Sequence, residues 1–232
     1  MNRRALALAF ALFFSLFCMN ATAQVEQVFS STVNDEAALV EEMNAWLSSN
    51  DAKDGQTTTL LANVVNGDDS STHYVVLDFP DYAKWQTHMD RTAKSGDFAK
   101  YQRRTSPLES GTGEGLYLRV TDNGKSWNAG DYLFVISVRV NTEAGKAYIA
   151  AFNEYVNSGL GKKAPGLIRL LAVRAGADNT HTVIISASTF VALNKFLDDN
   201  SGSAEMSVFL QKVGAISAPT GSSILRVVKV WK

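Results

Sequence analysis

The chain contains a single cysteine, Cys18, among its 232 residues. Cys18 lies in an N-terminal segment that we expect to be removed, so the remaining chain would contain no cysteine. That excludes disulfide bonds, thiolate metal sites and cysteine nucleophiles from the remaining chain. An exported chain without disulfides must be stabilised by its hydrophobic core, and a domain of roughly 200 residues is large enough to bury one.

Proline and clusters of one charge are also scarce. The sequence has four prolines, 22 Lys and Arg against 23 Asp and Glu, and a formal net charge of -1. No basic block stands out, so nothing in the composition indicates a nucleic-acid partner. With 46% hydrophobic residues and no low-complexity tract, the composition is that of a globular protein.

Histidines are few and far apart. The sequence contains His73, His88 and His181, and their spacing matches no common metal-binding motif. We therefore predict no metal site and no cofactor. Haem alone stays open, because one histidine is enough to ligate it.

No apolar run is long enough to span a bilayer. Residues 5–19 form an uncharged apolar stretch, shorter than the roughly 20 residues that a spanning helix needs. Arg3 and Arg4 precede it, and Ala21-Thr22-Ala23 follows with the pattern that a signal peptidase recognises. We expect residues 1–23 to be a signal peptide and the protein to be periplasmic or secreted, free of the membrane after cleavage. An uncleaved membrane anchor is the alternative.

The first half of the remaining chain has the pattern strand, helix, strand, strand, helix, strand. Its strands are expected at residues 27–33, 57–65, 72–79 and 115–120. Asn34 is a candidate N-cap for the first helix, whose apolar face carries Leu39, Val40, Met43, Trp46 and Leu47. Pro80 and Asp81 open the second, a single amphipathic helix that runs toward Arg104.

The second half repeats this order at an offset of about 108 residues. Its strands are expected at residues 132–140, 167–174, 180–187 and 223–231, with helices beginning after Asn141 and at Thr189. Matching positions include Gly67 with Gly176, Thr72-His73 with Thr180-His181, Tyr82 with Phe190, and Trp85 with Leu193. Agreement in element order, turn position and residue identity indicates an internal duplication. We predict a first repeat at 24–120, a polar linker at 121–130 and a second repeat at 131–232.

Each repeat has the order of a ferredoxin-like unit. The strands are apolar on both faces, as in Tyr74 and Val76 against Val75 and Leu77, so neither face of the sheet can be left in water. The helices of a repeat can cover one face, and the sheet of the other repeat is the obvious cover for the second. We therefore predict an α+β fold in which two tandem β-α-β-β-α-β repeats form an intrachain, barrel-like pseudo-dimer. Because the duplication supplies the partner, we expect a monomer.

The segment after the third strand resembles the dimeric α/β barrel superfamily, in particular its antibiotic-biosynthesis-monooxygenase-like (ABM-like) domains. Those domains often carry an aromatic residue at the strand end, then a helix with an alanine, a histidine and a later aromatic residue. The matching residues here are Phe79, Tyr82, Ala83, Trp85, His88 and Tyr101. The resemblance implies the fold and a range of functions, because the superfamily includes cofactor-independent monooxygenases, haem-degrading enzymes, chlorite-dismutase-like haem proteins and stress-responsive proteins.

His88 is the candidate catalytic residue. It shares a helical face with Tyr82 and Trp85, and the duplication places Phe196 at its position in the second repeat. A histidine in an apolar pocket can act as an acid, a base or a ligand. The alternative is a core histidine bonded to a backbone carbonyl. His73 and His181 are duplicated at the start of a strand, which local hydrogen bonding explains better than catalysis.

Trp46, Tyr82, Trp85 and Tyr101 are the candidate ligand-binding residues. Aromatic side chains with polar atoms, placed on sheet-facing helices, can line an apolar pocket. Ordinary core packing is the alternative. The glycine-rich segment 110–115 precedes a strand rather than a helix, so we interpret it as a loop and not as a phosphate cradle.

Two functions are compatible with these features. The first is a non-catalytic exported protein that binds a small apolar or aromatic ligand, or a protein partner. The second is a cofactor-independent monooxygenase-like enzyme, with a pocket in the first repeat and His88 as its catalytic residue.

Overall fold

The computed structural model describes residues 24–232 except residues 54 and 68. The predicted signal peptide and Cys18 therefore lie outside the described residues. The strands form one closed antiparallel barrel in the order β1-β3-β2-β8-β5-β7-β6-β4. The predicted α+β pseudo-dimer is confirmed, and the two sheets that the sequence placed face to face are joined into a single barrel.

The strands fall at nearly the predicted places. The first half contributes β1 (Val25–Val33), β2 (Thr57–Val65), β3 (His73–Phe79) and β4 (Glu109–Asp122). The second half contributes β5 (Tyr132–Val140), β6 (Ile168–Ala175), β7 (His181–Ala187) and β8 (Ser217–Trp231). The last strand of each half begins earlier than its pattern predicted.

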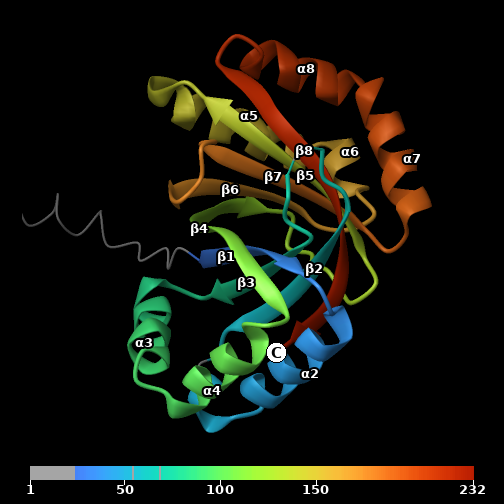
Figure 1. Cartoon of the computed structure of the whole chain (residues 1–232). Coiled ribbons are helices and arrows are strands. Elements are labelled where there is room, and N and C mark those ends of the chain that lie inside the picture. The colour runs from blue at the N-terminus through green and yellow to red at the C-terminus, as the bar shows by residue number, and fades with distance from the viewer. Residues whose placement is uncertain (1–23, 54, 68) are drawn as a thin grey trace, which may run out of the picture.

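The helices lie on two opposite sides of the barrel (Figure 1). The first-half group contains α2 (Glu36–Leu47), the short η1 (Asn50–Ala52), α3 (Tyr82–Thr92) and α4 (Gly96–Thr105). The second-half group contains the short η2 (Thr142–Ala144), α5 (Gly145–Val156), α6 (Gly159–Lys162), α7 (Phe190–Ser201) and α8 (Ala204–Val213). In the part of the chain that the structure describes, no helix is both long and apolar enough to cross a membrane.

The prediction of one helix after the third strand of each repeat is wrong, since each is a pair. The first helix of the pair, α3, ends at Thr92, and Ser95 caps the next, because its hydroxyl accepts a hydrogen bond from the backbone N–H of Phe98 at 3.0 Å. Ser203 does the same for Met206 at 3.0 Å. A serine N-cap satisfies one orphan N–H group and so starts a helix anew. The first helix, α2, is capped by Asp35 rather than by Asn34.

The prediction of a loop at residues 110–115 is also wrong, because this segment is the first half of β4. It pairs with β1 from Glu109 opposite Val33 to Gly115 opposite Val28. Gly113 leaves room for the neighbouring strand, since a Cβ atom there would lie 2.9 Å from Ser30 Oγ. The segment is therefore a glycine-bearing strand whose partner lies far away in the sequence.

The barrel closes through pairings between the two halves. β2 pairs with β8, where Leu61 lies opposite Val227, and β4 pairs with β6, where Leu118 lies opposite Ala172. Inward-facing side chains of both halves, including Val76 and Leu133, form the lumen core. The two outer faces are covered by the two helix groups. This explains why the strands are apolar on both faces.

The duplicated Thr-His pairs take the same local role in both halves. Thr72 Oγ1 accepts a hydrogen bond from the N–H of Val33 at 2.8 Å, and Thr180 Oγ1 accepts one from Val140 at 2.8 Å. Each hydroxyl also lies close to Nδ1 of the following histidine, at 2.9 Å for His73 and 3.0 Å for His181. These contacts agree with the prediction that the duplicated histidines take part in local hydrogen bonds.

Candidate functional site

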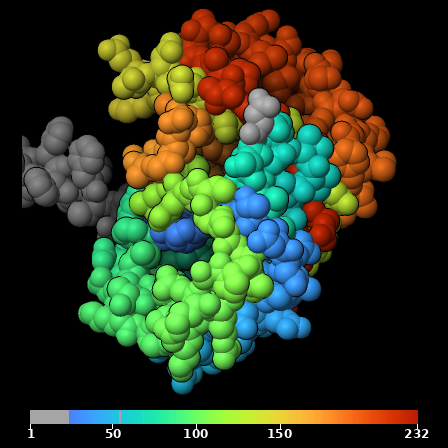
Figure 2. All heavy atoms as spheres, in the orientation of Figure 1, coloured from blue at the N-terminus to red at the C-terminus, as the bar shows by residue number. Residues whose placement is uncertain are grey.

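A cavity of about 550 Å³ lies between the first-half strands and their helices. It is bounded by β1, β2, β3 and β4 on the sheet side and by α2, α3 and α4 on the helix side. In Figure 2 the surface is hollowed here, and blue atoms of the N-terminal strand are visible at the bottom of an opening bordered by green atoms of residues near 100. The volume is in the range typical of small-molecule sites. We call this cavity the first-half pocket.

Aromatic side chains make up the helix wall of the first-half pocket. The ring of Phe98 lies 5.1 Å from that of Trp46 and 5.9 Å from that of Tyr101, centroid to centroid. Phe29 and Leu77 belong to the opposite, sheet side. Such a wall favours a flat apolar ligand, because aromatic pairs at these separations attract one another beyond simple burial.

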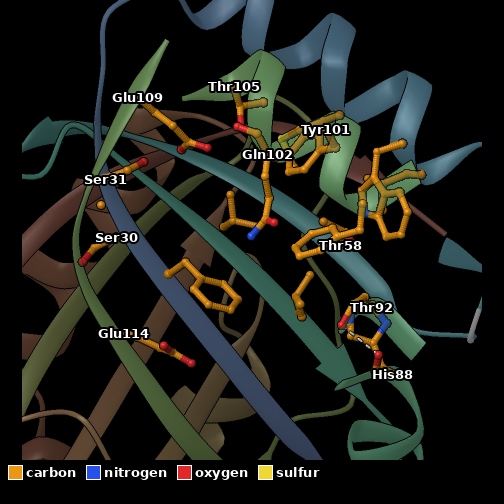
Figure 3. A pocket seen from close by; sticks show the side chains of 18 of the residues that line it. Ser30, Ser31, Thr58, His88, Thr92, Tyr101, Gln102, Thr105, Glu109 and Glu114 are labelled. Carbon is orange, nitrogen blue, oxygen red and sulfur yellow. Dashed lines mark hydrogen bonds between the residues drawn. The ribbon is translucent and has the colours of Figure 1, made fainter. Parts of the chain in front are cut away.

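The two carboxylates in the lining of the pocket are Glu109 and Glu114. Figure 3 shows the amide of Gln102 pointing toward the middle of the lining residues. Among the described residues that line the pocket there is no lysine or arginine. The site is therefore complementary to a neutral or cationic ligand with hydrogen-bond donors, and unfavourable to an anion.

Glu114 is held by a chain of hydrogen bonds that starts outside the pocket. The indole N–H of Trp85 donates to Oε1 of Gln27 at 2.9 Å. The amide nitrogen of Gln27, whose residue is 2% exposed, donates in turn to Oε1 of Glu114 at 2.6 Å. Because both donors are fixed, one carboxylate oxygen of Glu114 is oriented and the other is left for a ligand.

His88 lies at one end of the first-half pocket and is 5% exposed. Its ring packs against that of Phe79, with 5.3 Å between the centroids. One helical turn later, the hydroxyl of Thr92 donates to the backbone carbonyl of His88 at 3.0 Å (Figure 3). The equivalent Phe196 is 6% exposed. The fold thus buries this position in both halves, and only the first half places an imidazole there.

Burial and two carboxylates raise the pKa of Tyr101 far above its usual value. Desolvation is the largest cause, and the charges of Glu109 and Glu42 add to it. Both effects oppose the phenolate. Tyr101 is therefore a neutral hydroxyl at any physiological pH, able to donate or accept a hydrogen bond in the pocket.

Three of the five predicted site residues line the pocket, namely Trp46, His88 and Tyr101. Tyr82 lies outside it with 41% of its surface exposed. Trp85 is also outside the lining and acts through Gln27. Sequence reasoning missed Phe98, Gln102, Glu109, Gln27 and Glu114. The aromatic stripe of α4 could have revealed Phe98, whereas Glu114 lies in the segment 110–115 that was interpreted as a loop and Glu109 directly precedes it.

The pocket exists because the two halves differ at a few equivalent positions. Met43, Thr58 and Thr105 of the first half are replaced by Phe152, Ile168 and Val213 in the second. In the second half, Phe209 packs against Tyr148, Phe152 and Tyr155, with ring centroids 5.7–6.1 Å apart. The same scaffold is filled by larger side chains there. The space in the first half is therefore not required by the fold.

The donor set of the first-half pocket does not suit haem. The two propionates of a haem would meet Glu109 and Glu114, and the described lining residues supply no arginine or lysine to balance them. Within residues 24–232, apart from the two that are not described, no three His, Cys, Asp or Glu side chains gather as a metal site would need.

No protein-family model and no curated protein matches the sequence. The structure is similar to a candidate monooxygenase from Fusobacterium nucleatum, with a TM-score of 0.65 and 13% identity over 91% of this chain and 95% of that one. It is similar to an anthrone oxidase-like protein, with a TM-score of 0.62 and 11% identity over 91% and 94%. It is also similar to a candidate chlorite dismutase, with a TM-score of 0.55 and 10% identity over 90% and 96%.

These neighbours belong to the ABM-like and chlorite-dismutase-like branches of the dimeric α/β barrel superfamily. The chain has the fold of that superfamily, with both of its units in one polypeptide. At such low sequence identity, the structural similarity establishes the fold and not the activity, which depends on the residues of the pocket.

Proposed function

We propose that the protein is an exported binding protein for a small aromatic molecule, which it holds in the first-half pocket. The observation that carries this proposal is the difference between the halves. The second half fills the equivalent space with Phe152, Ile168 and Val213, whereas the first half keeps about 550 Å³ open. Open space in a duplicated scaffold lowers stability, since a cavity forfeits packing contacts. A bound ligand restores those contacts.

The lining residues narrow the ligand class. The rings of Trp46, Phe98 and Tyr101 favour an aromatic body. Glu109 and Glu114 favour hydroxyl or amino groups on that body and repel carboxylates. The proposed ligand is therefore an aromatic alcohol or amine rather than an aromatic acid.

Calorimetric titration with 2-naphthol and 2-naphthoate tests this proposal. We expect 2-naphthol to bind and 2-naphthoate to bind at least about tenfold more weakly. A triple variant with Met43→Phe, Thr58→Ile and Thr105→Val fills the pocket with the second-half residues and is expected to lose 2-naphthol binding. The matched control is Phe152→Met in the second half, which should bind as the wild type does. Equal binding by the folded triple variant would overturn the proposal.

A cofactor-independent oxygenase is the second candidate, and His88 is the observation that favours it. A base in the pocket wall can remove a proton from an activated CH₂ group, which then reacts with O₂. One oxygen atom enters the ring as a carbonyl and the other leaves as water, so that no external reductant is needed. One neighbour is an anthrone oxidase-like protein, which makes anthrone a suitable probe.

Oxygen uptake with anthrone distinguishes the two candidates. An enzyme should consume O₂ above the uncatalysed rate, and His88→Phe should remove most of that excess while anthrone binding is kept. A binding protein should give no excess in the wild type. Uptake that His88→Phe leaves unchanged would contradict the proposed role of His88.

We also propose that the protein reaches the periplasm or the cell exterior after removal of residues 1–23. Arg3, Arg4, the apolar run and Ala21-Thr22-Ala23 support this. Expression of the full chain in a bacterium, followed by fractionation and intact-mass measurement, tests it. A periplasmic product that begins at Gln24 is expected. A full-length product in the membrane fraction would instead support an uncleaved anchor.

A further inference from the structure

A second cavity, of about 570 Å³, lies inside the barrel itself. It is lined by inward-facing side chains of both halves, from Val28 and Val76 in the first to Val135 and Ile184 in the second. An eight-stranded barrel is just wide enough either to be filled by its own side chains or to hold one small ligand. Here the buried lumen cluster leaves part of the lumen open, and most of its residues also line that space. We call the open section the lumen cavity.

The lumen cavity is open because its inward positions carry short side chains. Val28 and Val135 face it from β1 and β5, and Ser137, Thr182 and Ser223 face it from β5, β7 and β8. It reaches the surface at the turn between β2 and β3, where Gly67 and Asp69 are exposed, and at the exposed residues Thr220, Gly221 and Ser222 of β8. A small molecule can therefore enter from this end.

The opposite end of the lumen cavity is closed by Trp127 and a cluster of charged side chains around Glu26. Trp127, from the predicted linker at 121–130, is 8% exposed, and its indole N–H donates to Thr59 Oγ1 at 3.2 Å. The guanidinium of Arg169 lies 5.0 Å from the Trp127 ring centroid and pairs with Glu26 at 2.7 Å. Arg119 pairs with the same carboxylate at 2.9 Å. The two arginines thus neutralise the charge of Glu26. The cavity is closed at this end and open only at the other.

The lumen cavity differs from the first-half pocket in the chemistry of its walls. The lumen cavity has more branched aliphatic side chains in its lining, among them Leu61, Val76, Leu133 and Leu225, beside the aromatic Tyr74, Tyr117 and Trp127. The helix wall of the first-half pocket is instead formed largely by aromatic rings. An aliphatic chain fills such a chamber better than a flat ring does, because its volume adapts to a narrow lumen.

Asp69 provides a negative charge at the mouth of the lumen cavity. The hydroxyl of Tyr74 donates to Asp69 Oδ2, and the backbone N–H of Ser71 donates to Oδ1 at 2.8 Å. Burial opposes the charge, yet these hydrogen bonds keep the pKa of Asp69 below its usual value. The described lining residues include no lysine or arginine. An ammonium group is therefore favoured at the mouth and a carboxylate is not.

We propose that the lumen cavity is a second ligand site, which takes an aliphatic amine with its chain in the lumen and its ammonium group at Asp69. This site is independent of the aromatic ligand proposed for the first-half pocket. The two sites are separated by the sheet, because the lumen cavity is lined by Val28 and Val76 and the first-half pocket by Phe29 and Leu77 of the same strands.

Calorimetric titration of the purified protein with octylamine, 1-octanol and octanoate tests the ligand class. We expect octylamine to bind, 1-octanol to bind about tenfold more weakly, and octanoate to show no binding. Asp69→Asn should bring octylamine to the affinity of 1-octanol and leave 1-octanol unchanged. No octylamine binding at about 1 mM, or equal binding of all three probes, would overturn the proposal.

Two variants that fill the lumen test the location. Val135→Phe and Ser223→Leu enlarge inward side chains from two different strands, and circular dichroism identifies whichever of them folds. Either folded variant should weaken octylamine binding at least tenfold. The triple variant of the first-half pocket is the matched control and should bind octylamine as the wild type does. Octylamine binding that persists in a folded lumen variant, or that is lost in the triple variant, would contradict the lumen site.

Discussion

At the scale of single residues, the duplication supplies an internal reference for each side chain. His88 and Phe196 occupy equivalent buried positions, at 5% and 6% exposure. A scaffold that accepts phenylalanine in one half has the shape to accept it in the other. Packing alone therefore does not require a histidine at position 88, and we predict that the first-half pocket accounts for it.

Exchanging the two residues tests this interpretation. We expect His88→Phe to cost less free energy of unfolding than the reverse change at Phe196, because the first-half pocket beside His88 has space for the larger ring. Phe196→His should cost about 2 kcal/mol or more, because it buries a polar ring among Leu193, Phe152 and other apolar side chains. Urea unfolding measures both changes. A larger loss for His88→Phe than for Phe196→His would make His88 a structural residue.

His181 gives a prediction about pH. Burial, and secondarily the positive charge of Arg174, lower the pKa of His181 in the folded state. The unfolded chain takes up a proton near pH 6.5, whereas the folded chain does so only at lower pH. The stabilising contribution of His181 is thus present above pH 6.5 and is lost as the pH falls through the folded pKa.

Urea unfolding of the wild type and of His181→Asn at several pH values between about 7.5 and 5 measures that contribution. The wild type should lose stability relative to the variant as the pH falls, with a slope of at most about 1.4 kcal/mol per pH unit. The two proteins differ only at position 181, so the contributions of all other groups to the pH dependence cancel to first order. Parallel pH profiles of the two proteins would contradict the prediction.

At the scale of elements, helix α3 and strands β1 and β4 cooperate to orient one carboxylate. Trp85 reaches from α3 to Gln27 on β1, and Gln27 reaches Glu114 on β4. Removing the indole N–H of Trp85 should make the side chain of Glu114 less well ordered. Because Trp85 does not line the pocket, all of the lining residues are kept. We classify Trp85 as a positioning residue for this reason.

The variant Trp85→Phe keeps an aromatic ring and removes the indole N–H. We expect 2-naphthol to bind about three- to tenfold more weakly, as the loss of one neutral hydrogen bond implies. Naphthalene, which has no donor, should bind as it does to the wild type. Tyr82→Phe on the same helix, outside the pocket, is the control. Equal losses for 2-naphthol and naphthalene would point to a packing effect instead.

The turns between the second and third strands of the two repeats give a matched pair of glycines. Gly67 and Gly176 both have positive φ, at +58° and +82°. A Cβ atom on Gly67 would meet nothing within 4 Å, whereas one on Gly176 would lie 2.1 Å from the carbonyl oxygen of Glu114. The turn at Gly176 therefore packs directly against the backbone of β4 at Glu114.

Alanine at the two positions should have unequal effects. Gly67→Ala should cost about 1 kcal/mol, the usual penalty for a left-handed residue with a Cβ atom. Gly176→Ala should cost more than about 2 kcal/mol, because strain at φ adds to a clash with backbone, and should also weaken 2-naphthol binding. Urea unfolding and calorimetry measure the two effects. Equal costs at both positions would contradict the close approach to β4.

At the scale of the whole molecule, the barrel formed by the described strands is closed, so none of these strands has an edge free for another chain. The pairings that a single repeat would need from a second molecule are made within the chain, between β2 and β8 and between β4 and β6. We therefore predict a monomer in solution. Size-exclusion chromatography with light scattering should give the mass of one chain at all concentrations tested, and a stable dimer would contradict this.

Much of the fold could be predicted from the sequence because it depends on local signals that occur twice. The alternation of Tyr74, Val75, Val76 and Leu77 indicates a strand that is buried on both sides, and the Thr-His pairs mark equivalent strand starts. The two helix pairs were not predicted, because Ser95 and Ser203 interrupt stretches that otherwise favour helix. The glycine-rich start of β4 has no strand pattern of its own and is held by β1.

The candidate site was predicted only in part for the same reason. Trp46, His88 and Tyr101 lie on helical faces whose orientation follows from periodicity. The roles of Gln27 and Glu114 depend on strand register, since β1 must pair with β4 so that Phe29 lies opposite Glu114. Register is set by long-range pairing, which a single sequence does not display.

The sequence by itself thus determined the duplication, the ferredoxin-like order of elements and the aromatic stripes, because each of these is encoded by residues close together in the chain. Only the tertiary structure decided that the sheets close into one barrel, that Trp127 plugs one end of it, and that space remains at two places. Cavities depend on the summed volume of side chains from distant segments. For that reason the two proposed ligand sites could be identified only in the folded molecule.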